Sequence, residues 1–140
     1  MTAPSPYLAA RLAIEDITAH LDRRSAAAII SATPAWFGDL RRSVEYEITM
    51  APHLMIEGGD DPDAFWTFEH ALQSRHRDLG SRALDYARVC DTTTARTRLA
   101  DAVAAAEMVL LLGPGVLGDD VRATLLAPLR AGLPGDPRLV

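Results

Sequence analysis

Three prolines follow directly on residues that favour helix N-caps, and this pattern constrains the fold more than any other feature. The pairs are Ser5-Pro6, Thr33-Pro34 and Asp61-Pro62. Ser, Thr and Asp side chains accept hydrogen bonds from the first amides of a helix. Proline is tolerated at the first helical position because its missing N–H would have no partner there. Each pair therefore predicts the start of a helix.

The segments after these pairs carry apolar residues at a spacing near 3.6, which is typical of amphipathic helices. The expected stripes are Ala10, Ile14, Ile17 and Leu21, which Ala28 can extend; Phe37, Leu40, Val44 and Ile48; and Phe65, Phe68, Leu72 and Leu79. Pro52 should end the second helix, because the residue before a proline is displaced from the α region. Gly80 is placed to terminate the third helix in the left-handed conformation.

Further helices are expected over 82–89, after Ser81, and over 95–112, after the polar run 91–94. The second half of the 95–112 segment is apolar nearly all round, which predicts a central helix buried on several sides. A shorter helix is expected over 119–126, with Pro128 ending or kinking it. The Pro- and Gly-rich tail over 132–140 is expected to be frayed.

These patterns predict an all-α fold. The chain of 140 residues favours one domain over 1–140, and we expect a bundle of about five to six helices. The segment that best fits a strand instead of a helix is 44–50, where β-branched and aromatic residues cluster. The helix interpretation is preferred there because it also explains Phe37 and Leu40 upstream.

The charge excludes several classes of function. The net charge is −5 and the pI is about 5.2, whereas nucleic-acid binding needs a basic surface. All 14 basic residues are arginine, so mechanisms that need a lysine are excluded. The arginine and alanine usage is typical of a GC-rich bacterial genome.

No secretory leader or apolar span is recognisable, so we expect a cytoplasmic protein that does not bind membranes.

Candidate metal or nucleophilic residues are few. Asp16/His20 and His53/Glu57 have the i, i+4 spacing that places each pair on one helix face. A metal site needs three or four converging ligands, so surface ion pairs are the preferred interpretation and no metal or cofactor is expected. Cys90 is the only cysteine and lies at the expected end of a helix, where no helix dipole lowers its pKa.

Aromatic and basic residues supply the candidate binding residues. Trp36 and Trp66 each lie one position off the apolar stripe of their helix, so either side chain could line a pocket or a partner surface. Residues 70–98 carry six arginines against three acidic residues, a net charge of +3 in an acidic chain. The candidate anion-binding residues in that stretch are Arg75, His76, Arg77 and Arg82.

Two functional hypotheses remain open. The first is a small non-catalytic helical module for protein–protein interaction or regulation, which binds a protein partner or forms a homodimer. Self-association is expected because the second half of the 95–112 helix is apolar nearly all round, and a chain of this size would not cover that surface alone. The alternative is a pocket protein or small enzyme that acts on a small anionic ligand. Arginine suits that role because its planar fork holds carboxylate or phosphate with two hydrogen bonds.

Overall fold

The helices form a bundle around one central helix. The computed structural model describes residues 6–50, 92–112 and 117–139, and for 6–11 and 47–50 it describes the backbone only. The elements of these residues are five α-helices and one 3₁₀ helix, with no strand among them: α1 (Pro6–Ala19), α2 (Arg23–Ala32), α3 (Phe37–Met50), α6 (Thr93–Leu112), α7 (Asp119–Gly132) and η1 (Pro137–Leu139). The all-α prediction is confirmed, including the helix over 44–50.

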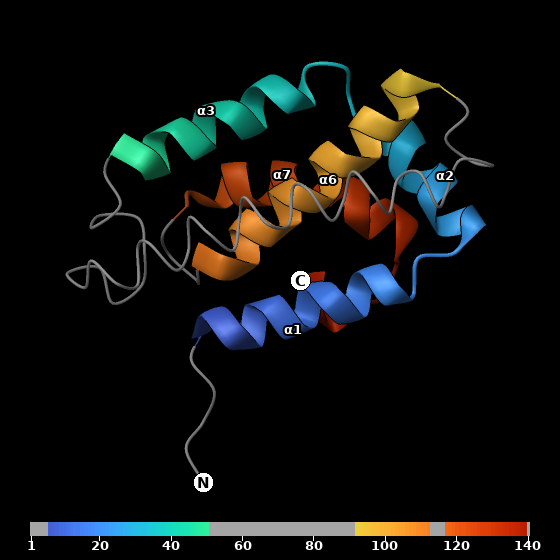
Figure 1. Cartoon of the computed structure of the whole chain (residues 1–140), viewed down its shortest axis with the longest axis horizontal. Helices are drawn as coiled ribbons and strands as arrows, with labels where there is room; N and C mark the ends of the chain where they lie inside the picture. Colours follow the sequence, from blue (N-terminus) through green and yellow to red (C-terminus); the bar gives the residue numbers. More distant parts are fainter. Residues whose placement is uncertain (1–5, 51–91, 113–116, 140) are drawn as a thin grey trace, which may run out of the picture.

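Helix α6 is the centre of the described fold. It contacts α1, α2, α3 and α7, and Figure 1 shows it between α3 on one side and α1 on the other. Residues Ala102–Val109 of α6 are all buried, as are Leu111 and Leu112. The central position predicted for this helix is therefore confirmed. Its burial within the chain removes the reason given above for self-association, because the chain itself covers this apolar half.

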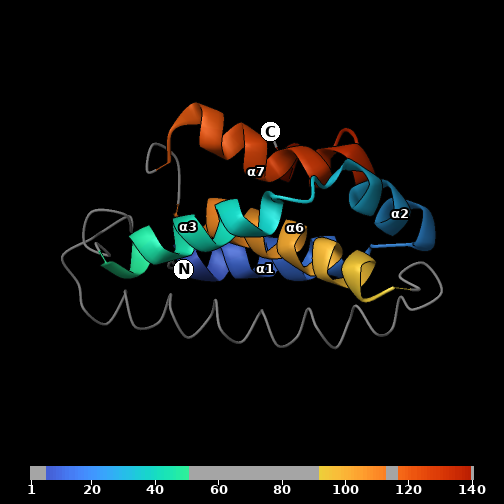
Figure 2. The same ribbon diagram turned by 90° about the horizontal axis from the view of Figure 1, so that it is seen from above.

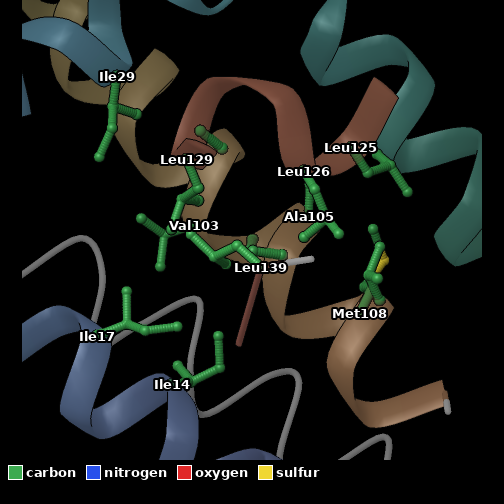
Figure 3. Close-up of a cluster of buried hydrophobic side chains, with 14 of the residues drawn as sticks. Ile14, Ile17, Ile29, Val103, Ala105, Met108, Leu125, Leu126, Leu129 and Leu139 are labelled. Atoms are coloured by element: carbon green, nitrogen blue, oxygen red, sulfur yellow. The ribbon is translucent and has the colours of Figure 1, made fainter. Parts of the chain in front are cut away.

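The core joins side chains from every described element. Figure 3 shows Ile14 and Ile17 of α1 facing Val103 of α6, with Leu139 of η1 between α1 and α7. Leu125, Leu126 and Leu129 bring α7 onto the same cluster, and Ile29 brings α2. Figure 2 shows α7 lying across the layer that α1, α3 and α6 form.

The first predicted stripe belongs to two helices. Ile14, Ile17 and Leu21 are buried as expected, but α1 ends at Ala19, and Ala28 lies in α2. The reason is local: the Asp22 side chain accepts a hydrogen bond of 2.7 Å from the Ser25 amide and starts a new helix.

Two other helix starts differ from the sequence prediction. Thr33 ends α2 instead of starting α3, because its hydroxyl donates to the Ile29 carbonyl at 2.7 Å. α3 begins only at Phe37, after a turn in which the Phe37 amide donates to the Pro34 carbonyl at 3.1 Å. α6 begins at Thr93, two residues before the predicted start, because the Thr92 hydroxyl accepts from the Ala95 amide at 3.1 Å.

The C-terminal region is more regular than predicted. α7 continues through Pro128 to Gly132, and Pro128 is buried with Leu125, Leu126 and Leu129. Burial of the side of α7 that carries Pro128 offsets the free-energy cost of a proline inside a helix. The tail from Gly132 turns back on the bundle where a frayed end was predicted. Its Leu139 is 1% exposed, and the Leu139 carbonyl accepts a hydrogen bond from Arg130 of α7.

None of the helices in these described ranges has the length and apolar character that crossing a bilayer requires.

Candidate interaction surface

The inner side of α3 is fastened to α6 by a buried arginine. Arg41 is 8% exposed. Its Nε donates to Oδ1 of Asp101 at 2.9 Å, and its Nη1 donates to Oε1 of Glu45 at 2.5 Å. A guanidinium taken out of water is tolerated when carboxylates pair with it and accept its hydrogen bonds. This network sets the position of α3 on α6.

Gly38 allows the close approach that this network requires. A Cβ atom at position 38 would lie 2.5 Å from Oδ2 of Asp101, which is closer than real Cβ contacts come. The missing side chain therefore leaves room for the carboxylate that holds Arg41.

The opposite side of α3 carries what we call the outer stripe: Trp36, Asp39, Arg42, Ser43 and Tyr46. All five are exposed. Trp36 precedes the helix, but its carbonyl accepts from the Asp39 and Leu40 amides, so it continues the helical path. The spacing of three and four residues places these side chains along one side of the helix.

Two large aromatic side chains stand at the ends of the outer stripe. Trp36 is 55% exposed and Tyr46 is 65% exposed. The Trp36 ring lies against the buried Phe37 ring, with centroids 6.5 Å apart and an interplanar angle of 49°. Phe37 belongs to the core, so this contact limits the freedom of the indole.

The middle of the outer stripe carries one charge of each sign. Asp39 and Arg42 form an ion pair across one helical turn, and both side chains are largely exposed. A hollow of about 540 Å³ lies alongside, and the described residues that line it are Asp39, Arg42, Ser43 and Tyr46. The outer stripe thus combines aromatic, polar and charged groups beside a shallow depression.

A second hollow lies where the C-terminal turn meets α1. It has a volume of about 490 Å³, and its lining includes Asp16, Asp136 and Arg138. The Arg138 side chain holds Asp136 through two bonds, with Nε 2.8 Å from Oδ1, and also pairs with Asp16. The hydrogen bond from Arg138 lowers the pKa of Asp136, and the same bond raises the pKa of Arg138. These charges already pair with one another and tie the tail to α1.

A third, smaller hollow of about 230 Å³ lies between the turn before α3 and the start of α6. Arg98 and Asp101 both line it, together with three threonines. Its two charged groups have opposite signs, and Asp101 is engaged by Arg41. Deeper in the bundle, Glu107 of α6 is a carboxylate only 1% exposed.

Most of the predicted site residues fall outside the described ranges: Trp66, Arg75, His76, Arg77, Arg82, His53, Glu57 and Cys90. The anion-binding hypothesis therefore stays a prediction. Trp36 is within the described ranges, and the structure exposes it while burying its neighbour Phe37.

Asp16 and His20 are exposed neighbours, with Nδ1 of His20 2.8 Å from the Asp16 carbonyl and 3.5 Å from its carboxylate. Among the residues that the structure describes, no three His, Cys, Asp or Glu side chains gather as metal ligands would.

Sequence reasoning missed Tyr46 and the buried Arg41. Tyr46 lies with Trp36, Asp39 and Ser43 at helical spacing, away from the apolar stripe of α3, and this second periodicity could have identified it. Arg41 occupies an inward position between Phe37 and Val44, but its partner Asp101 is sixty residues away in the sequence. No local pattern predicts that pairing.

Comparison of the chain with protein-family models, with curated proteins and with solved structures finds no match.

Proposed function

We propose that this chain is a small non-catalytic helical module that works by protein–protein interaction, and that it associates with a second copy of itself through the outer stripe of α3. The observation that carries the proposal is the exposure of Trp36 and Tyr46 on one side of one helix. Tyrosine and tryptophan are enriched at protein interfaces and among the residues that contribute most of the binding energy.

The rigidity of α3 supports this role. The ion pair of Arg41 with Asp101 and the buried side chains of Phe37 and Val44 hold the helix on the core. The Trp36 indole is further restrained by its contact with Phe37. Association costs less conformational entropy when the contacting residues are already ordered. A fixed helix with exposed aromatic ends is therefore well suited to bind a folded surface.

The test is sedimentation velocity over a range of protein concentrations. The wild-type protein should sediment above the monomer mass of 15.1 kDa as its concentration rises. The double variant Trp36→Ala/Tyr46→Ala should stay monomeric, because it removes both exposed rings. Leu12→Ala is the matched control, since it removes an exposed apolar side chain from α1 and should leave association unchanged.

Circular dichroism of each variant verifies that the helices are intact. A wild-type protein that remains a monomer at high micromolar concentration would contradict the proposal. Association that is unchanged in the double variant would contradict it equally.

A further inference from the structure

The chemical groups along the outer stripe are arranged symmetrically about its middle. Trp36 and Tyr46 are centred on position 41, and the oppositely charged Asp39 and Arg42 have almost the same midpoint. A two-fold axis at this level would exchange the aromatic ends and also exchange the two charges. The outer stripe is therefore complementary to a second copy of itself when the two helices run in opposite directions.

We infer that two copies of this chain pair through antiparallel α3 helices. The two-fold axis then passes between the two outer stripes, at the position of Arg41 along each helix. Trp36 of one copy then faces Tyr46 of the other, and Asp39 faces Arg42 and Ser43. The two aromatic positions are about 15 Å apart along the helix at 1.5 Å per residue, so both aromatic contacts form in the same arrangement. This inference rests on the proposed function and adds the orientation and the register of the contact.

The charges favour this orientation over a parallel one. In a parallel pairing of equal register, Asp39 would face Asp39 and Arg42 would face Arg42, so like charges would oppose each other. The antiparallel pairing gives two attractive Asp–Arg contacts, because every contact of a two-fold interface occurs twice. Opposed like charges exclude wrong arrangements more effectively than attraction between exposed charges stabilises the right one.

The hollow beside the outer stripe is consistent with the same register. Asp39, Arg42, Ser43 and Tyr46 line it, and the antiparallel arrangement brings Trp36 of the second copy to its Tyr46 end. Offset or edge-on packing of the two rings adds to the energy of burying them. One side of one helix is smaller than the standard interface, which buries about 800 Å² per partner. We therefore expect a weak dimer that depends on concentration.

Two charge reversals, tested apart and together, provide the experiment. Asp39→Arg places two cations in the middle of the stripe, and Arg42→Asp places two anions there. Each variant alone should dimerise at least about tenfold more weakly than wild type, because both contacts become repulsive. An equimolar mixture of the two variants should form a heterodimer, since two cations then face two anions. The double reversal Asp39→Arg/Arg42→Asp in one chain should dimerise like wild type.

Controls separate repulsion from other effects. Asp39→Asn and Arg42→Gln remove the same intrachain pair without introducing repulsion, so they should weaken association less than the reversals do. Asp120→Arg mixed with Arg24→Asp makes the same changes in net charge at exposed positions outside the stripe and should change nothing. The readout is sedimentation velocity, with melting temperatures to verify folding.

Three outcomes overturn the inference: single reversals that dimerise like wild type, a mixture that stays monomeric, or a double reversal that stays monomeric. If one of these occurs while Trp36→Ala/Tyr46→Ala still abolishes association, the antiparallel register is wrong and the proposed function stands. If the aromatic variant also associates normally, the proposed function is wrong as well.

Discussion

At the scale of single residues, Gly132 marks a close approach of α7 to α2. A Cβ atom there would lie 2.3 Å from Cγ1 of Ile29 and 2.8 Å from the Ser25 carbonyl oxygen. The side chain of Ile29 can adjust, whereas the backbone oxygen can move only with its helix. The packing of the two helices therefore depends on the absence of one methyl group.

We expect Gly132→Ala to lower the free energy of unfolding by about 1–3 kcal/mol, as overpacking a filled core does. Urea denaturation measures the change. Gly118→Ala is the matched control, because no atom lies within 4 Å of its added Cβ, and the preference of an N-cap for glycine over alanine should limit its cost to about 0.5–1 kcal/mol. Equal losses in the two variants would contradict the close approach at Gly132.

Asp22 is a second residue with a specific local role, because its carboxylate caps α2. The hydrogen bond from the Ser25 backbone amide lowers the pKa of Asp22 below its usual 3.8. A lowered pKa in the folded state means that the ionised form stabilises the fold. This contribution is present above the unfolded pKa and is lost as the pH falls through the lower folded value.

We therefore expect Asp22→Asn, which keeps a capping oxygen but cannot ionise, to differ from wild type in a pH-dependent way. Its melting temperature should lie below that of wild type at neutral pH and should approach it as the pH falls below about 4. Asp22→Ala, which removes the cap at every pH, should be the less stable variant throughout. A constant difference between wild type and Asp22→Asn across this range would exclude the contribution of the charge.

At the scale of elements, the attachment of α3 to α6 depends on Arg41. Its bond to Asp101 joins the two helices where Gly38 leaves room for the carboxylate, and its bond to Glu45 lies within α3. The neighbouring Arg42 pairs with Asp39 in the exposed stripe. Two adjacent arginines of one helix thus occupy opposite environments.

Arg41→Ala should lower the free energy of unfolding by about 3–5 kcal/mol, because it leaves a largely buried carboxylate without its ion pair. Arg42→Ala should cost about 0–1 kcal/mol, as removal of an exposed pair does. Both are measured by urea denaturation at low protein concentration, where association does not contribute. A large loss for Arg42→Ala with a small one for Arg41→Ala would reverse our assignment of the two sides of α3.

At the scale of the whole molecule, the C-terminal turn closes the bundle against α1. Leu139 enters the core between α1 and α7 (Figure 3), and Arg138 pairs with Asp16 of α1. Residues near the two ends of the chain therefore stabilise each other through both a core contact and a charged one.

Leu139→Ala should cost about 2–5 kcal/mol, the range for removing a fully buried leucine side chain. Leu12→Ala, in the exposed part of α1, should change the free energy of unfolding by no more than about 0.5 kcal/mol. Thermal unfolding followed by circular dichroism compares them. A tail that can lose Leu139 without loss of stability would be the frayed end that its composition suggested.

The sequence alone was sufficient for the fold class, for the central helix and for much of the core, because these depend on periodicity within one segment. Ile14, Ile17, Phe37 and Val44 are buried as their stripes predict. The same periodicity singled out Trp36 as a candidate binding residue, since it lies one position off the apolar stripe of its segment.

Only the tertiary structure decided which competing local signal prevails and which distant residues meet. Asp22 and Thr33 are both good caps, but one starts α2 and the other ends it. Pro128 stays helical because its helix is buried on the side that carries it. Arg41 with Asp101, and Arg138 with Asp16, are paired across long stretches of sequence. Such pairings depend on how whole helices pack, and the free energy of that packing does not belong to any one segment.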